Sequence, residues 1–149
     1  MLPRVDYSVS VPVSVDASFR AFQDFERLLH RGIYIEAAWI AGEPWQVGSR
    51  VRYVISHPVE ATISAVVTSI SPPRAVSLLN HALGVTAEQH VSFSSDLKGG
   101  TRIRMMMNLI GKSTELSDSA VHDAVTFITR DALDTVVSLC RRPASSATG

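Results

Sequence analysis

Residues 117–142 read SDSAVHDAVTFITRDALDTVVSLCRR, and this stretch decides which folds the rest of the chain can adopt. Its apolar residues recur every three or four positions, which predicts one long helix with a broad apolar face. Ser117 can cap the first turn, the terminal arginines suit the negative helix end, and Pro143 stops the helix. The positions that define this face are Val121, Val125, Ile128, Ala132, Val136 and Leu139. Such a face must be covered by another element.

Six runs before this helix have the composition and alternation of β-strands. Turn residues such as Gly42, Pro58 and Gly99 separate them. No crossover helix fits between them, so an antiparallel meander is expected. The six runs are 35–40, 50–56, 60–70, 75–80, 87–95 and 101–110.

A seventh strand is expected over residues 7–13, which read YSVSVPV with valines on one face and serines opposite. Pro12 marks it as an edge strand or marks its end. Asp16 is the expected N-cap of a short helical segment that carries three phenylalanines on one stripe and is closed by Gly32.

The order of these elements predicts an α+β fold. A seven-stranded curved antiparallel sheet would wrap around the long C-terminal helix, with short helices after the first strand. Residues 1–142 would form this single domain, and residues 143–149 a disordered tail. Because a sheet that curls around one helix leaves space between them, a ligand cavity is expected there.

Charge and composition argue against several classes of partner. Fourteen basic and fourteen acidic residues cancel to a formal charge of zero, so neither nucleic acid nor an anionic membrane surface should be attracted. No stretch has the apolar length of a membrane span and no export signal is visible, so we expect no membrane insertion and a cytoplasmic location. The lone Cys140 cannot form an internal disulfide, and packing is the expected role of its thiol.

Motifs for metals and nucleotide cofactors are absent from the sequence. The five histidines show no pairing at three or four residues and no cysteine partner, which predicts no metal site. The chain has no Walker loop, no G-x-G-x-x-G fingerprint and no G-x-S-x-G elbow. We therefore expect no cofactor.

Several segments resemble one known superfamily. They are residues 9–13 with 16–19, the turn GEPWQVGSR at 42–50, GGTRI at 99–103, and the terminal helix. Together they are similar to the START-like, or Bet v 1-like (SRPBCC), superfamily, and within it to the bacterial polyketide cyclase/dehydrase and lipid-transport group. The resemblance implies the helix-grip fold. It leaves function open, because the superfamily includes lipid carriers, hormone receptors, cyclases and chaperone activators.

Strand alternation predicts which side chains face the cavity. Small residues such as Ala61 and Ala65 would leave room, and the flexible methionines could serve as lining or as ordinary core. Trp39 could form a hydrophobic corner or stack on a ring-shaped ligand. The predicted lining is Trp39, Val51, Tyr53, Ile55, Ile63, Ala65, Leu79, Val91, Phe93, Ile103, Met105, Met107, Val121, Val125 and Ile128.

Three polar residues are candidates for catalysis. Tyr53 could aim its hydroxyl at a ligand carbonyl, and His81 at a strand end could act as a base at the cavity mouth. Gln89 faces inward if Ala87, Val91 and Phe93 do. A hairpin register shifted by one residue would instead bring in Glu88 and His90.

Three functions are compatible with this pattern. The first is binding, sequestration or transport of a small hydrophobic molecule such as a lipid, polyketide or aromatic metabolite in the cavity. The second is a polyketide cyclase/dehydratase-like enzyme that uses the same cavity without metal or nucleotide. The third is a protein-interaction module like the chaperone activators. A homodimer is compatible with all three.

Overall fold

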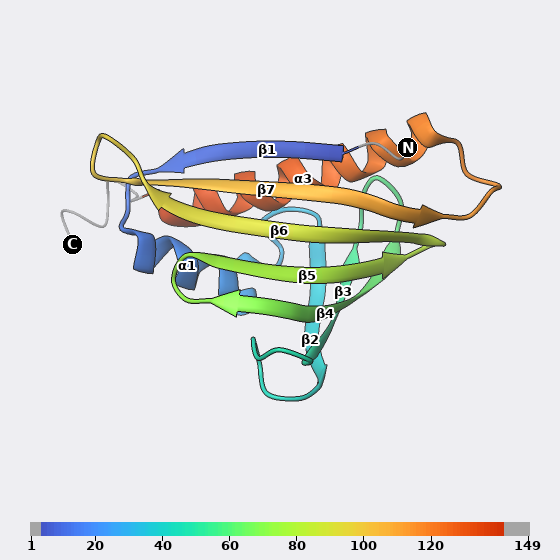
Figure 1. Cartoon of the computed structure of the whole chain (residues 1–149), viewed down its shortest axis with the longest axis horizontal. Helices are drawn as coiled ribbons and strands as arrows, with labels where there is room; N and C mark the ends of the chain where they lie inside the picture. The colour runs from blue at the N-terminus through green and yellow to red at the C-terminus, as the bar shows by residue number, and fades with distance from the viewer. Residues whose placement is uncertain (1–3, 142–149) are drawn as a thin grey trace.

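The computed structural model describes residues 4–141, which form one seven-stranded sheet and three helices (Figure 1). In chain order the elements are β1 (Arg4–Val11), α1 (Val15–Gln23), α2 (Phe25–Leu28), β2 (Tyr34–Ala41), β3 (Arg50–Ile55), β4 (Ala61–Ser71), β5 (Ala75–Ala82), β6 (Val85–Ser95), β7 (Thr101–Lys112) and α3 (Asp118–Cys140). The disordered tail predicted for residues 143–149, and residue 142, lie outside the described residues.

The sheet has the order β1-β7-β6-β5-β4-β3-β2, and every neighbouring pair is antiparallel. The first strand therefore pairs with the last, while β2 to β7 form the expected meander. Figure 1 shows β2 and β3 crossing the direction of β5 to β7 steeply, so the sheet curls, and α3 runs along β1 and β7. The predicted helix-grip fold is confirmed.

Register shifts interrupt three of the strand pairs. They occur between Tyr34 and Glu36, and between Trp39 and Ala41, in β2, with others in β4 and β7. A β-bulge bends its strand and increases the local twist. These shifts help the sheet to curl, and the first one changes which side chains of β2 face inward.

The N-terminal helical segment differs from the sequence prediction in its cap and its continuity. Ser14, in extended backbone, caps α1 by accepting a hydrogen bond from the Ala17 amide at 3.1 Å. The predicted cap, Asp16, instead lies in the first turn, where its charge suits the helix dipole. Asp24 ends α1 and caps α2 by accepting from the Arg27 amide. For α3 the predicted cap is correct, since Ser117 accepts from the Ala120 amide at 3.1 Å.

Polar contacts attach α3 to both edges of the sheet. At the β1 edge, the Tyr7 hydroxyl donates to Asp134 Oδ1 at 2.8 Å. Near the β2 edge, the Ile33 amide donates to Asp131 Oδ2 at 3.0 Å. Asp131 and Asp134 are three residues apart, and the two edges they contact are the two ends of the strand order. The helix therefore bridges the curled sheet.

The concave side of the sheet is divided into a filled end and an open end. At the filled end, Phe19 and Phe22 of α1 pack edge-on against Phe93, with ring centroids 5.1 and 5.8 Å apart. Val91 and Ile103 are fully buried beside them. This end is the hydrophobic core, and the cavity described below occupies the rest of the concave side.

Candidate functional site

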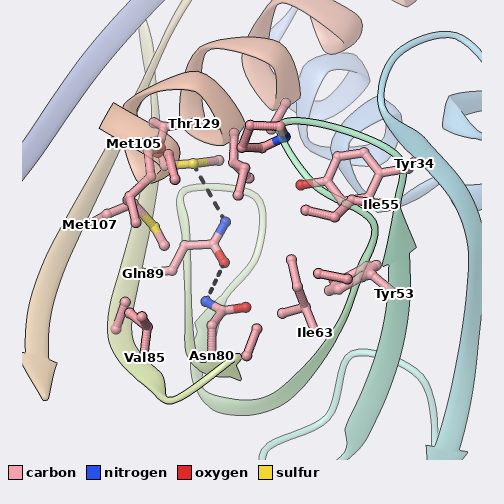
Figure 2. Close-up of a pocket in the computed structure, with 18 of the residues that line it drawn as sticks. Tyr34, Tyr53, Ile55, Ile63, Asn80, Val85, Gln89, Met105, Met107 and Thr129 are labelled. Carbon is pink, nitrogen blue, oxygen red and sulfur yellow. Dashed lines mark hydrogen bonds between the residues drawn. The ribbon is translucent and has the colours of Figure 1, made fainter. Parts of the chain in front are cut away.

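A cavity of about 300 Å³ lies between α3, the short helices and the concave face of the sheet. Its volume is at the lower end of the range for small-molecule sites, roughly 300–1,000 Å³. Figure 2 shows part of its wall. The helices and the C-cap residue of α2 contribute Phe22, Phe25, Leu28, Leu29, Ala120, Val121, Ala124, Val125, Ile128, Thr129, Ala132, Thr135 and Val136. The strands and loops contribute Tyr34, Ala37, Tyr53, Ile55, Pro58, Val59, Ala61, Ile63, Asn80, Ala82, Leu83, Val85, Ala87, Gln89, Met105, Met107 and Leu116.

Part of the predicted lining lies in this wall. These residues share the inward face of their strands or the apolar stripe of α3. They are Tyr53, Ile55, Ile63, Met105, Met107, Val121, Val125 and Ile128.

Another group of predicted lining residues faces inward but does not reach the cavity. Their strand parity was predicted correctly, but they are packed in the buried cluster that includes Phe19 and Phe22 of α1, so they form core. They are Val51, Ala65, Val91, Phe93 and Ile103, all almost fully buried.

Trp39 and Leu79 are also outside the cavity wall. Trp39 stacks on Phe25 with ring centroids 5.8 Å apart, and Phe25 in turn lines the cavity. Leu79 was assigned to the wrong face, because its neighbour Asn80 lines the cavity and successive residues of a strand alternate.

A chain of polar contacts crosses one wall of the cavity (Figure 2). Asn80 Nδ2 donates to Gln89 Oε1 at 2.8 Å, and Gln89 Nε2 donates to Met105 Sδ at 3.5 Å. A thioether sulfur is a weak acceptor, so the Gln89 amide has donor capacity left for a ligand. Both amide side chains are half-buried.

The register of β6 places Gln89 inward, as the apolar alternation predicted. Gln89 is opposite Met107 of β7 and Leu78 of β5. Glu88 and His90 consequently lie on the outer face, where Glu88 Oε2 is 3.8 Å from His90 Nε2. The alternative register is therefore wrong.

Tyr34 and Tyr53 line the cavity wall on the other side. Their rings meet edge-on with centroids 5.6 Å apart, and Tyr53 also meets Phe25 edge-on at 5.3 Å. Burial raises the pKa of both hydroxyls well above the ordinary value, with a smaller contribution from the Asp131 carboxylate at Tyr34 and from Tyr34 at Tyr53. Both phenols therefore stay protonated near neutral pH and can act as hydrogen-bond donors. Figure 2 shows the Tyr34 hydroxyl pointing into the cavity.

His81, the third catalytic candidate, does not reach the cavity. Asn80 and Ala82 on either side of it line the wall, so His81 points to the outer face of β5. Its side chain is exposed, and its Nδ1 is 2.9 Å from Thr86 Oγ1. The prediction that it lies at the mouth is wrong, because β5 extends two residues beyond the predicted end.

The cavity wall is uncharged throughout the described residues. It contains no Asp, Glu, His, Lys, Arg or Cys. In residues 4–141, no three His, Cys, Asp or Glu side chains are grouped as metal ligands would be. None of the helices in this part of the chain has the length and hydropathy needed to cross a membrane.

The sequence reasoning missed four polar lining residues, which are Tyr34, Asn80, Thr129 and Thr135. Tyr34 lies just before the predicted start of its strand, and the bulge after it lets Tyr34 and Ala37 share the cavity wall despite their odd spacing. Asn80 follows the buried Val76 and Leu78 at every second position, a signal that could have identified it.

Comparison with known proteins supports the fold. No protein-family model and no curated protein matches the chain. Among solved structures, the ZhuI aromatase/cyclase from Streptomyces sp. R1128 aligns with a TM-score of 0.80 at 12% identity over 97% of this chain and 98% of that one. A START superfamily protein from Mycobacterium smegmatis aligns with a TM-score of 0.76 at 11% identity, over 92% and 96% of the two chains. Ara h 8.0201 aligns with a TM-score of 0.75 at 10% identity, over 94% and 98%.

These likenesses define the structural class of the protein. The chain has the helix-grip fold of START-like and Bet v 1-like proteins, as its sequence resemblance implied. At 10–12% identity the comparisons establish the fold alone. An argument about function must therefore start from the cavity.

Proposed function

We propose that this protein binds a small hydrophobic molecule in the cavity between α3 and the sheet, and so sequesters or carries it. The observation that supports this most directly is the cavity itself, about 300 Å³ with an almost wholly apolar wall. Water gains few hydrogen bonds in such a space, so an apolar ligand that displaces it gains free energy in proportion to the area buried.

The composition of the wall favours binding over proton-transfer catalysis. A general acid or base works best when its pKa is near the working pH. The titratable groups of the described wall are the two phenols, and burial raises the pKa of each well above neutrality. A cyclase/dehydratase-like enzyme would have to use Tyr34, Tyr53 and the Asn80–Gln89 pair to position and polarise a substrate.

The first experiment is native mass spectrometry of the protein purified from its own host, followed by organic extraction. We expect a co-purifying apolar molecule, or uptake of the uncharged dye N-phenyl-1-naphthylamine with increased fluorescence. A protein that carries no molecule and takes up neither the dye nor any compound of a broad apolar panel would contradict the proposal. That result would favour an interaction module.

A cavity-filling variant provides the structural control. Ala124 lines the cavity from α3, and Ala124→Phe would place a ring inside it. We expect dye binding to fall at least tenfold, because the ring occupies volume that the dye needs. Ser138→Phe adds the same side chain at an exposed position of the same helix and should leave binding unchanged. Equal binding by both variants would place the dye elsewhere.

Replacement of the buried phenol separates carrier from enzyme. Tyr53→Phe removes one hydroxyl and retains the ring that packs against Phe25. A carrier should bind purely apolar ligands with nearly unchanged affinity, whereas an enzyme that uses this hydroxyl should lose turnover. Turnover of a polyketone substrate that disappears in Tyr53→Phe would replace the carrier proposal.

A further inference from the structure

The polar groups of the cavity are few and lie on opposite walls, which constrains the ligand more closely than size and hydrophobicity do. On one wall, Asn80 and Gln89 are joined by a 2.8 Å hydrogen bond. On the facing wall, Tyr34 directs its hydroxyl inward (Figure 2). The rest of the surface is aliphatic, aromatic and thioether, except for the Tyr53 phenol and the hydroxyls of Thr129 and Thr135, which donate to backbone carbonyls of α3.

The amide pair is arranged to accept and donate toward a ligand. The hydrogen bond between Asn80 Nδ2 and Gln89 Oε1 leaves Asn80 Oδ1 as an acceptor, a second hydrogen on Asn80 Nδ2, and the Gln89 Nε2 hydrogens, one of which contacts only the Met105 sulfur. The pair therefore offers a ligand both an acceptor and donors. A ligand hydroxyl can serve both, and a ketone can accept from Gln89.

The Tyr34 hydroxyl supplies the second polar point. It makes no hydrogen bond to any other described residue, and its oxygen is not sealed from the cavity. A ligand that packs against this hydroxyl must offer a hydrogen-bonding atom there, or the hydroxyl is left without a partner. An oxygen on the ligand at this end would satisfy it.

Charge on the ligand is disfavoured because the described wall has no ionised side chain to compensate it. Moving a carboxylate or ammonium group from water into such a site costs several kcal/mol unless it is paired. The aromatic side chains of Phe22, Phe25 and Tyr53 also line the cavity and favour contact with flat rings.

From these observations we infer that the ligand is an uncharged ring compound with an oxygen function at each of two opposite ends, one bound by Asn80 and Gln89 and the other by Tyr34. This inference rests on the proposed function and specifies its ligand class. It makes the cavity selective for neutral hydroxylated or keto-substituted ring compounds over hydrocarbons and over acids of the same shape.

Naphthalene derivatives provide matched probes in a competition assay against N-phenyl-1-naphthylamine. Naphthalene, 2-naphthol and 2,6-dihydroxynaphthalene differ only in their hydroxyl groups. We expect affinity to rise roughly threefold to tenfold with each hydroxyl, since a neutral hydrogen bond contributes about 0.5–1.5 kcal/mol. At pH 7, 6-hydroxy-2-naphthoate should bind at least a hundredfold more weakly than its uncharged methyl ester.

Variants assign the two ends. Tyr34→Phe preserves the ring and should remove the gain in affinity that one of the two ligand hydroxyls provides. The double variant Asn80→Leu with Gln89→Met should remove the gain that the other hydroxyl provides. The affinity of each variant for naphthalene is its reference, so the hydroxyl preference is measured as a ratio within one variant. Glu88→Gln, next to Gln89 on the outer face, is the control and should change nothing. Circular dichroism establishes whether each variant is folded. If the double variant does not fold, the hydroxyl preference of Tyr34→Phe alone tests the inference.

The outcomes separate this inference from the proposed function. If all naphthalenes bind equally, or the carboxylate binds within tenfold of its ester, the inference is overturned while the binding function stands. The same holds if hydroxyl preference survives in Tyr34→Phe and the double variant. If neither dye nor any naphthalene binds, the proposed function itself fails.

Discussion

Gly32 lies where the chain enters β2 close under α3, and replacing it should be costly. A Cβ atom at this position would be 2.5 Å from Asp131 Oδ2 and in even closer conflict with Thr135 Oγ1. Asp131 Oδ2 is the atom that accepts the Ile33 amide, and Thr135 Oγ1 donates to the Asp131 carbonyl at 2.7 Å. Gly32→Ala must therefore displace a group that already holds a hydrogen bond.

The size of the effect follows from those two contacts. Crowding a packed site by one methyl group costs about 1–3 kcal/mol, and losing a hydrogen bond to a charged group costs about 1.5–3 kcal/mol. Because moving the carboxylate relieves part of the crowding, the two costs overlap. We expect Gly32→Ala to lower the free energy of unfolding by about 2–4 kcal/mol, with β2 and Tyr34 shifting away from α3.

Urea unfolding followed by tryptophan fluorescence and far-UV circular dichroism measures this change. Gly111→Ala is the matched control, because the nearest atom to its added Cβ would be Thr86 Cβ at 4.0 Å, an ordinary contact. The control should change stability by less than about 1 kcal/mol. Combining Gly32→Ala with Asp131→Ala should cost less than the sum of the single changes. If the free energy of unfolding of Gly32→Ala is within about 0.5 kcal/mol of that of the unmodified protein, the reasoning is refuted.

Two other predictions test the core and the tyrosines. Leu133→Ala, at a fully buried position outside the cavity wall, should cost about 2–5 kcal/mol in urea unfolding yet change dye affinity less than twofold. The chain has three tyrosines, and each has a raised pKa: a hydrogen bond to Asp134 raises it at Tyr7, and burial raises it at Tyr34 and Tyr53. A raised folded-state pKa contributes stability below the unfolded value of about 10 that is lost at higher pH. Alkaline titration should therefore show tyrosinate absorbance at 295 nm rising together with unfolding, and ionisation of all three at pH 10 in a folded protein would contradict this.

Strand alternation predicted the inward residues well wherever burial fixes the register. Ile63, Met105, Met107 and Gln89 were placed on the correct face because a one-residue slip would expose the whole apolar set of their strands. The same argument correctly predicted that Gln89 faces inward and that Glu88 and His90 lie on the outer face. The fold could therefore be predicted from pattern alone.

The sequence pattern failed where the concave face is divided or where the period of two is broken. Val51 and Phe93 alternate as lining residues do, but α1 and its neighbours cover that end of the sheet, and strand periodicity does not encode a helix packed across it. Tyr34 was not predicted as a lining residue because a bulge follows it. Asn80 was not predicted because a polar residue on the inward face interrupts the apolar series. Together with Gln89, which was predicted correctly, Tyr34 and Asn80 are the residues that would contact the polar ends of a ligand. Local rules fail most often at functional positions.

The cavity persists because the fold prevents its collapse. Apolar atoms that line such a space have fewer packing contacts than atoms in a filled core, which costs stability. Polar contacts from Asp131 and Asp134 attach α3 near both edges of the curled sheet, and the helix cannot approach the sheet without breaking them. Small residues on the cavity side of the helix, such as Ala124 and Ala132, keep the space open. A ligand of the inferred class would recover part of this cost, so it should raise the unfolding temperature by an amount that grows with the logarithm of its affinity, and a hydrocarbon of equal size should raise it less.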